Sequence, residues 1–245
     1  MSDGSAAASS RAGRRAAYER LRAERPQMFA NPPGTPIEIV FDEKLQDEAA
    51  GLSAEAQRDR GLPAEFGDIG VLYEDSYLKL VKDAVRFPSG RLGTYIRTFA
   101  AVEGEGVVVF ATAADGRIAL VRHYRHGCRE WHWEFPRGFA EPGLGGAQNA
   151  AKEMQEEVGV AAGTVNFLGW LDGQDSDHKV GVYHVTADLP EEPEVTAEAA
   201  EEGIDGIRLV TARQLESMIR AGELTDMFTL SAYAIAVAGG VVARP

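Results

Sequence analysis

The sequence has little cysteine, no long apolar run and no excess of positive charge. A single cysteine, Cys128, among 245 residues excludes an internal disulfide and is typical of a reducing cytoplasm. No apolar run is long enough to cross a bilayer, and the basic start MSDGSAAASSRAGRR lacks the apolar core of a secretion signal. We therefore expect a cytoplasmic protein without a membrane partner.

Basic residues are outnumbered, because 25 Lys and Arg stand against 38 Asp and Glu, for a formal net charge of −13. Nucleic acids are bound through basic surface, so none is expected as a partner. The sequence also has no G-x-S-x-G elbow and no G-x4-G-K-[ST] loop, which excludes the serine esterases and P-loop enzymes that carry them. An anionic substrate would need a metal ion or well-placed arginines.

The pattern along the chain predicts an α+β fold with a mixed sheet, because strands alternate irregularly with few helices. We expect a disordered tail at 1–12, an N-terminal extension at 13–66 with a helix near 14–25, and one large domain at 67–240. The predicted strands are 77–87, 93–102, 106–113, 117–125, 165–171, 179–187 and 206–210. The predicted later helices are 146–158, 212–222 and 226–238.

The stretch GFAEPGLGGAQNAAKEMQEEVGV, residues 138–160, places a glycine-rich loop before a helix with three clustered glutamates. Helical spacing predicts one core face, made of Ala147, Ala150, Ala151, Met154 and Val158. It places the glutamates, Glu153, Glu156 and Glu157, about one turn apart on a neighbouring face.

A solvated acidic face is the usual explanation for such a glutamate run. Two observations oppose it here. The glutamates lie at the carboxyl end of the helix, where the macrodipole disfavours each anion by about 0.3–1 kcal/mol. Apart from Lys152, no basic residue accompanies them. Clustered carboxylates of this kind are typical ligands of hard divalent ions, so we expect Mg²⁺ or Mn²⁺.

The same stretch resembles the Nudix box, G-x5-E-x7-R-E-U-x-E-E-x-G-U, in which U is a bulky apolar residue. Seven positions agree with it: Gly138, Glu153, Met154, Glu156, Glu157, Gly159 and Val160. The segments IALVRHYR and WEFPRG before the box, and ARQLESMIRAGELTDMFTLSAYAIA after it, resemble the ADP-ribose and nucleotide-sugar pyrophosphatase branch of that family. The resemblance covers about residues 68–240 and implies a Nudix-type α/β/α sandwich.

Two box positions differ from the pattern. Leu144 stands where the box has its loop glutamate, and Lys152 stands where it has arginine, while Glu141 lies three residues earlier in the loop. In the family, the glutamate and the arginine help to hold the loop and the metal ligands. Lysine supplies a charge without the two-pronged donor of arginine. These differences bear on the reaction rate more than on the metal site.

The resemblance implies metal-dependent hydrolysis of a nucleoside diphosphate sugar to a nucleoside monophosphate and a sugar phosphate. It implies that Glu153 and Glu157 are the main metal ligands and catalytic residues, with Glu156 as a third ligand and the Arg137 carbonyl beside them. The general base is expected on the loop EVTAEAAEEGID, where Glu202 is preferred over two alternatives, Glu198 and Glu201.

Three further positions match substrate-contacting positions of the branch: Arg97 in TYIRTF, Arg125 in HYR, and Glu134 in WEFPRG. A guanidinium group suits a diphosphate because it donates two parallel hydrogen bonds. For each arginine, the alternative is an ordinary position on the surface of a strand. The branch also implies a homodimer.

The stretch HYRHGCREWH contains three histidines and the cysteine, and it suggests zinc at first sight. Strand alternation points His123 and His126 to opposite faces, and the spacing matches no standard zinc motif, so we expect none there. Two other functions stay open from sequence. One is a catalytically weakened Nudix-fold module that senses a nucleotide sugar, and the other is a scaffold without a ligand. The base and the sugar of the substrate are not specified.

Overall fold

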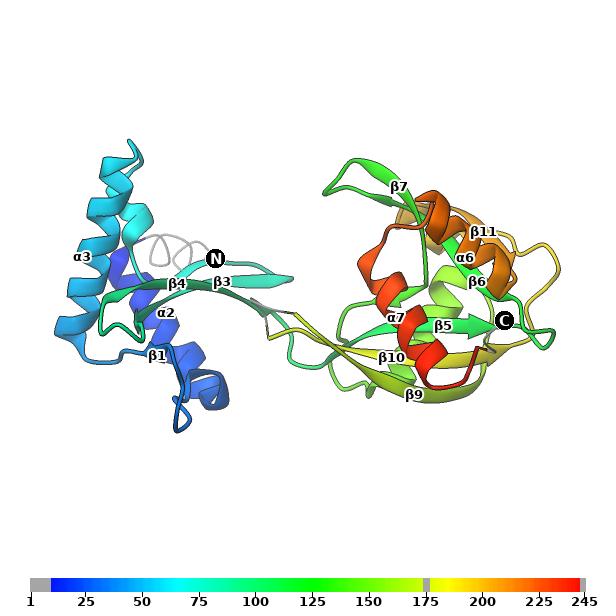
Figure 1. The fold of residues 1–245 in the computed structure, drawn as a ribbon, viewed down its shortest axis with the longest axis horizontal. Coiled ribbons are helices and arrows are strands. Elements are labelled where there is room, and N and C mark those ends of the chain that lie inside the picture. The colour runs from blue at the N-terminus through cyan, green and yellow to red at the C-terminus, as the bar shows by residue number, and fades with distance from the viewer. Residues whose placement is uncertain (1–9, 174–176, 243–245) are drawn as a thin grey trace. The chain divides into compact units, whose positions relative to one another are not determined.

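The computed structural model describes residues 10–173 and 177–242, in two compact units (Figure 1). The first unit comprises residues up to 102 together with 173–177, and the second comprises 103–172 and 178 onward. Most of the expected tail at 1–12 lies outside the described residues, as does part of the 172–179 loop. Among the described residues, no helix combines the length and the apolar character needed to cross a membrane.

The first unit packs helices against a four-stranded antiparallel sheet. Its helices are α2 (Arg11–Glu24), η1 (Pro26–Phe29), α3 (Glu43–Asp59) and η2 (Ala64–Gly67). Its strands are β1 (Glu38–Ile39), β2 (Gly70–Glu74), β3 (Leu78–Arg86) and β4 (Leu92–Ala100). The helix predicted near 14–25 is confirmed as α2, which the Ser10 side chain caps by accepting from the Gly13 N–H.

Strand β3 is the centre of this sheet, because it pairs with β1, β2 and β4. Helix α2 packs on β2, and α3 packs on β3 and β4. The strands predicted at 77–87 and 93–102 are therefore present, and they belong with the N-terminal helices in one compact unit. The first compact unit extends to residue 102. The domain bounds of 13–66 and 67–240 stay a prediction.

The second unit is built on a mixed sheet with the strand order β11-β6-β5-β10-β9. These strands are β5 (Glu105–Thr112), β6 (Ile118–Arg125), β9 (Ala162–Asp172), β10 (Lys179–Ala187) and β11 (Ile204–Val210). Strands β5 and β10 are parallel and the other pairs are antiparallel. Two short strands complete the sheet: β7 (Glu130–Glu134) on β6, and β8 (Arg137–Gly138) on β5.

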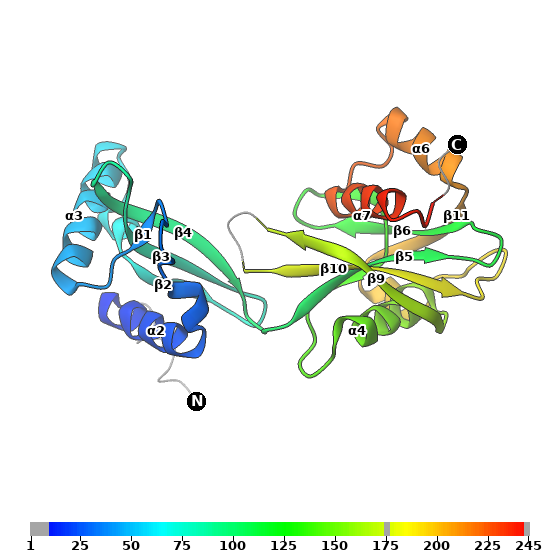
Figure 2. The ribbon, with the colours of Figure 1, turned by 60° about the horizontal axis from the view of Figure 1, so that its bottom comes forward.

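Helices cover both faces of this sheet (Figure 2). They are α4 (Gly146–Glu153) with η3 (Met154–Val158) on one face, and α6 (Ala212–Ala221) and α7 (Met227–Ala238) on the other. The alternation along β5 explains the two cores. Val107 and Val109 pack in the cluster that contains Met154, whereas Val108 and Phe110 pack in the cluster with α6 and α7. The predicted α/β/α sandwich with a mixed sheet is confirmed.

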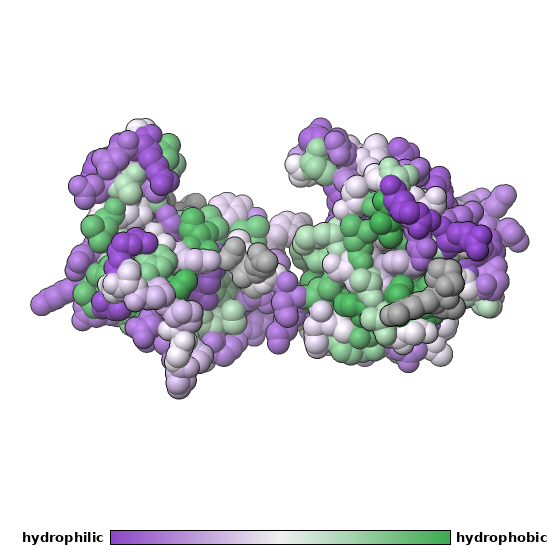
Figure 3. Space-filling model, viewed as in Figure 1, coloured by the Kyte–Doolittle hydropathy of each residue, from purple (hydrophilic) through white to green (hydrophobic). Residues whose placement is uncertain are grey.

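Helix α7 has an almost wholly apolar sequence, MFTLSAYAIAVA. Asp226 caps its start by accepting from the Thr229 N–H at 2.8 Å. Its inner face supplies Ala232, Tyr233 and Ala236 to the core. Hydrophobic side chains also reach the surface over this helix (Figure 3), because apolar residues continue around it.

Candidate active site

The predicted helix at 146–158 is present, but its last turn is a π-helix, η3, which ends at Gly159 in the left-handed conformation, with φ of 75°. Single π turns of this kind frequently occur at functional sites. The start of the helix is tied to the loop before it, because the Asn149 side chain donates to the carbonyls of Phe139 (2.8 Å) and Glu105 (3.3 Å).

The buried face of the helix differs from the predicted one. Ala147 is exposed, so its assignment to the core was wrong. Helix α4 meets the sheet through Gly146, where an added Cβ would lie 2.2 Å from the Tyr183 hydroxyl oxygen, and this close approach leaves Ala147 outside. Glu153 and Glu157 are buried instead, with 6% and 1% of their surfaces exposed.

The two buried glutamates lie against the β8 segment. The Arg137 N–H donates to Oε2 of Glu157 at 3.0 Å. The Glu153 carboxylate fills the space beside Gly138, where a Cβ would lie 1.8 Å from its Oε1. The first glycine of the box is therefore required here, because any side chain at 138 would displace the Glu153 carboxylate.

Burial raises the pKa of Glu157 to about 8, and the neighbouring charge of Glu153 adds to the effect. Burial likewise raises the pKa of Glu153 to about 7, although the charge of Lys152 opposes the increase. Two carboxylates withdrawn from water at one place are costly to ionise together. A divalent cation between them would remove that cost.

Glu156 lies apart from this buried pair. Its carboxylate accepts a hydrogen bond from Lys152, and the Lys152 ammonium also lies 3.4 Å from Oε1 of Glu141. Among the described residues, the three box glutamates do not form a group whose ligand atoms all lie within 4.8 Å of one another. Glu141 thus supplies a loop-to-helix ion pair in place of the box glutamate, because it reaches Lys152 from three residues before Leu144.

The residues fit a hard divalent ion. The buried donor set is two carboxylates, and oxygen ligands of this kind are what Mg²⁺ and Mn²⁺ prefer. The space for Glu153 exists only because residue 138 is glycine. The residues that would hold the ion are Glu153 and Glu157, with the less buried Glu156 nearer the surface. The Arg137 carbonyl stays a predicted ligand.

Glu134 is a second buried carboxylate in the same unit, and it holds Arg125. Arg125 Nε donates to Glu134 Oε2 at 3.0 Å, and a second bond joins Arg125 Nη2 to Oε1. Burial by itself would raise the pKa of Glu134, but His123, Arg125 and Arg137 lower it overall. Glu134 therefore stays ionised and fixes the direction of Arg125 on β6.

His123 connects these two buried groups, and the sequence interpretation gave it no role in this site. Its Nδ1 lies 3.4 Å from Oε1 of Glu134 and 4.0 Å from Oε1 of Glu157. The side chain is buried on β6, two residues before Arg125. Strand periodicity carries the signal that could have identified it, since i and i+2 residues share one face of a strand.

Arg97 lies in the first unit, where its guanidinium is already engaged. Nε donates to Asp83 Oδ2 at 2.6 Å, Nη2 to Asp83 Oδ1 at 3.0 Å, and Nη1 to the Met28 carbonyl at 2.7 Å. The Tyr18 hydroxyl donates to Asp83 Oδ1 at 2.5 Å. Asp83 is buried, so this network pairs a buried charge.

The three loop carboxylates considered as the general base, Glu198, Glu201 and Glu202, are all exposed. They lie on or directly after α5 (Ala197–Glu201). The Thr196 hydroxyl, which also caps α5, donates to the Glu156 carbonyl at 3.2 Å and so ties this segment to η3. Of the three, Glu202 is the one whose charge contributes to the raised pKa of Glu153.

Three observations agree with one family: the fold, the Glu153 carboxylate packed beside Gly138, and the spacing of the box residues. The model of the NUDIX domain matches residues 103–228. The chain belongs to the Nudix family. The matched residues begin where the second compact unit begins, lie mostly within it, and include the buried glutamate pair.

Relatives of this Nudix protein include the ADP-ribose pyrophosphatase of Mycobacterium tuberculosis (strain ATCC 25618 / H37Rv), 36% identical over 119 residues. That match covers 47% of this chain and 56% of the relative. The Bacillus subtilis (strain 168) protein YjhB is 28% identical over 145 residues, covering 59% of this chain and 57% of the relative. The chain thus spans little more than half the length of these relatives.

A crystal structure of an ADP compounds hydrolase matches 70% of this chain and 90% of its own chain, with a TM-score of 0.58. At 19% identity this likeness shows the fold.

Proposed function

We propose that this Nudix protein hydrolyses the diphosphate of a nucleoside diphosphate sugar, with ADP-ribose as the first candidate, in the presence of Mg²⁺ or Mn²⁺. The products are a nucleoside monophosphate and a sugar phosphate. The buried Glu153–Glu157 pair carries the proposal, because two carboxylates with raised pKa values are expected where a cation is to be bound. The name of the mycobacterial relative supports the choice of ADP-ribose.

The protein groups have separate roles in the proposed reaction. A divalent ion held by Glu153 and Glu157 would neutralise the charge that develops on the diphosphate oxygens. Arg125 is directed by Glu134 and donates to the substrate phosphates. Glu202 takes the proton from the attacking water, since it is exposed and its charge is felt at Glu153.

We propose a homodimer, formed through the first unit, as the working assembly. Large apolar and aromatic side chains are exposed there on the sheet, among them Tyr73, Tyr95 and Ile96. Light scattering on the purified chain measures the assembly, and a monomer at micromolar concentration would contradict this part of the proposal.

The alternative function is a Nudix-fold sensor that binds a nucleotide sugar without cleaving it. Leu144 in place of the loop glutamate favours this alternative. The ion pairs of Lys152 with Glu141 and Glu156 oppose it, because they connect the loop to the helix.

The deciding experiment incubates the full chain with a panel of nucleotide sugars that includes ADP-ribose, with Mg²⁺ or Mn²⁺, and identifies the products by chromatography. We expect AMP and ribose 5-phosphate from ADP-ribose, and no product after EDTA is added or when Glu157 is replaced by Gln. Binding of a nucleotide sugar without any product, across the whole panel, would contradict hydrolysis and establish the sensor.

A further inference from the structure

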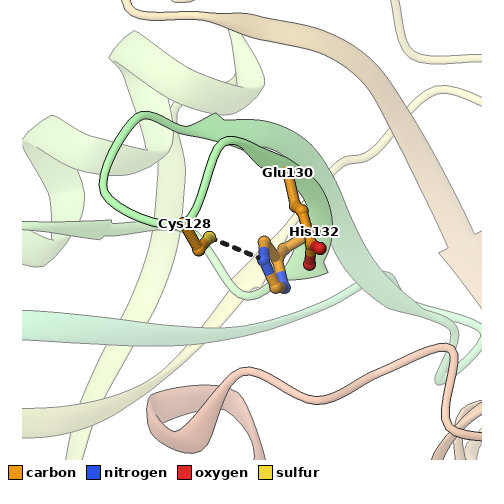
Figure 4. A group of neighbouring side chains, drawn as sticks. All are labelled: Cys128, Glu130 and His132. Atoms are coloured by element: carbon orange, nitrogen blue, oxygen red, sulfur yellow. Dashed lines mark hydrogen bonds between the residues drawn. The ribbon is translucent and has the colours of Figure 1, made fainter.

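The turn of the β6–β7 hairpin gathers three side chains that can bind a metal ion, away from the box glutamates in sequence. Cys128 lies in the turn, and Glu130 and His132 follow on β7 (Figure 4). One ligand atom from each, a sulfur, an oxygen and a nitrogen, lies within 4.8 Å of the other two. The turn is tight enough that Arg129, between Cys128 and Glu130, has a φ of 62°.

The distances suit one shared ion. Cys128 Sγ lies 3.2 Å from His132 Nε2. In a tetrahedral zinc site, bonds of about 2.3 Å to sulfur and about 2.0 Å to nitrogen place these two atoms about 3.5 Å apart. The pair would have to separate by only a few tenths of an ångström for an ion to lie between them.

The far side of the imidazole ring is also held as in a metal site. Thr225 Oγ1 lies 3.5 Å from His132 Nδ1, on the ring nitrogen opposite the one that faces Cys128. Histidine ligands of metals nearly always donate from their second nitrogen to an oxygen acceptor, usually a carboxylate, a backbone carbonyl or water, and the Thr225 hydroxyl oxygen occupies that position here. This contact is independent of the clustering of the three ligands.

The nearby Arg129 guanidinium is engaged by other side chains and does not pair with the Glu130 carboxylate. The Arg129 guanidinium contacts Nδ1 of His126 at 2.7 Å and lies over the Tyr124 ring at 5.4 Å from its centroid. Among the described residues, the Glu130 carboxylate has no hydrogen-bond or ion-pair partner. The carboxylate is therefore available as a third ligand.

We propose that Cys128, Glu130 and His132 form a binding site for a divalent transition metal of the zinc class, with water completing the coordination. A thiolate and an imidazole select such a metal over Mg²⁺ or Mn²⁺, which prefer oxygen ligands. The site is thus chemically distinct from the Glu153–Glu157 pair. The open fourth position and the exposure of the turn suit an exchangeable ion.

The sequence interpretation rejected zinc here because it sought ligands among His123, His126 and the other histidine and cysteine side chains. The structure places His123 beside the buried Glu134 and directs His126 to Arg129. The ligand that the interpretation omitted is Glu130. A carboxylate two residues from each of the other ligands carries no distinctive signal in a chain with 38 acidic residues.

Cobalt tests the site on the full chain, because Co²⁺ takes tetrahedral zinc sites and absorbs in the near ultraviolet when a thiolate binds it. Cys128 is the only cysteine, so this band reports on one residue. After chelation and reduction, we expect the band to saturate at one Co²⁺ per chain and to disappear when Zn²⁺ is added. The band is expected to be absent in Cys128→Ser.

Three variants distinguish a metal site with three protein ligands from metal binding by the Cys128 thiolate alone. His132→Gln and Glu130→Gln should each weaken Co²⁺ binding at least tenfold, and Thr225→Val about tenfold, since the loss of a supporting partner typically costs 10–100-fold. Glu157→Gln, the matched control at the other site, should leave the band unchanged. Circular dichroism establishes that each variant is folded.

Two results would overturn the proposal. One is the absence of a thiolate band in the folded wild-type chain. The other is a band whose affinity is the same in His132→Gln, or which saturates at one Co²⁺ per two chains, since either pattern means that isolated thiols are binding the ion. The readout is spectroscopic, so it does not depend on hydrolysis.

Discussion

At the scale of single residues, the site depends on carboxylates that differ in burial. Glu157 and Glu153 are removed from water, whereas Glu156 pairs with Lys152 and Glu202 is exposed. Burial disfavours the charged form of an acid, so the first two need a cation to ionise together. An exposed carboxylate keeps its charge without help and is free to move toward a substrate.

Replacing Glu202 by Gln is expected to lower kcat at least a hundredfold, because an amide cannot accept the proton of the attacking water and general-base catalysis contributes about 10²–10⁴-fold. The KM for metal and for substrate should change little. Steady-state kinetics with the first substrate found in the panel measure this. Glu198→Gln and Glu201→Gln are the matched controls, and an equal loss in either one would show that Glu202 is not the base.

His184 predicts a pH dependence of stability. Burial lowers its pKa below the usual value of about 6.5, and its Nε2 lies 2.8 Å from Thr112 Oγ1. The unfolded chain therefore binds a proton more readily than the folded chain as the pH falls below about 6.5. The contribution of neutral His184 to the free energy of unfolding is therefore fully present above about pH 6.5. It is lost as the pH falls toward the lower pKa of His184 in the folded chain.

Between pH 7 and pH 5, the wild-type chain should thus lose more unfolding free energy than His184→Gln. Urea unfolding at both pH values measures the difference. The prediction fails if the variant and the wild type lose the same amount.

At the scale of elements, the apolar patterns of the strands and the helical spacing of apolar residues predicted most of the fold. Strands such as 106–113 and 117–125 were predictable because apolar residues fill both faces of a central strand, and turn signals such as Asp115-Gly116 separate them. The first unit was harder to predict. Helix α3, which runs from Glu43 to Asp59 inside the predicted extension, buries few residues, so its largely polar sequence carries little periodic signal.

The candidate site was predictable only where its geometry is local. The spacing of the box glutamates follows from helical pitch, but three contacts arise from tertiary approach and leave no fixed pattern in sequence. They are the contact of His123 with Glu134, the ion pair of Glu141 with Lys152, and the hydrogen-bonded pair of Arg97 with Asp83. The exposure of Ala147 has the same cause, since Gly146 sets how the helix meets the sheet.

The hydrogen-bond geometry of residue 152 should affect how firmly the loop that contains Glu141 is held against helix α4. Lys152→Arg is expected to raise metal-dependent turnover by about two- to tenfold. The Lys152 ammonium already pairs with both Glu141 and Glu156, but as a point charge, whereas a guanidinium donates directed, paired hydrogen bonds. Turnover at saturating Mg²⁺ measures this, with Lys44→Arg on α3 as a matched control. If turnover does not rise, the lysine is not a source of impairment.

In the first unit, the Asp83 network should contribute to stability. Arg97→Met leaves the buried Asp83 carboxylate without its guanidinium partner, and breaking such a pair typically costs about 3–5 kcal/mol. Urea unfolding should show a loss of this order, whereas Arg91→Met, which removes an arginine stacked on Phe87, should cost much less. A change in the KM for substrate without a loss of stability would instead assign Arg97 to substrate binding alone.

At the scale of the whole molecule, the two compact units have separate cores, and both glutamates of the proposed cation site lie in the second unit. The chain carries a net charge of −13, and the second unit also buries the carboxylates of Glu134, Glu153 and Glu157. Burying the charges of Glu153 and Glu157 lowers the stability of the metal-free protein. A bound cation, or removal of one charge, would relieve this cost in free energy.

The most direct test measures Mn²⁺ binding to the wild-type chain and to Glu157→Gln, by the electron paramagnetic resonance signal of free Mn²⁺ near neutral pH. We predict that the variant binds Mn²⁺ at least tenfold more weakly, yet unfolds at the same or a higher temperature than the wild type when both are free of metal. Glu201→Gln, an exposed carboxylate, should match the wild type in both measurements. Equal Mn²⁺ affinity in Glu157→Gln and the wild type would contradict the account.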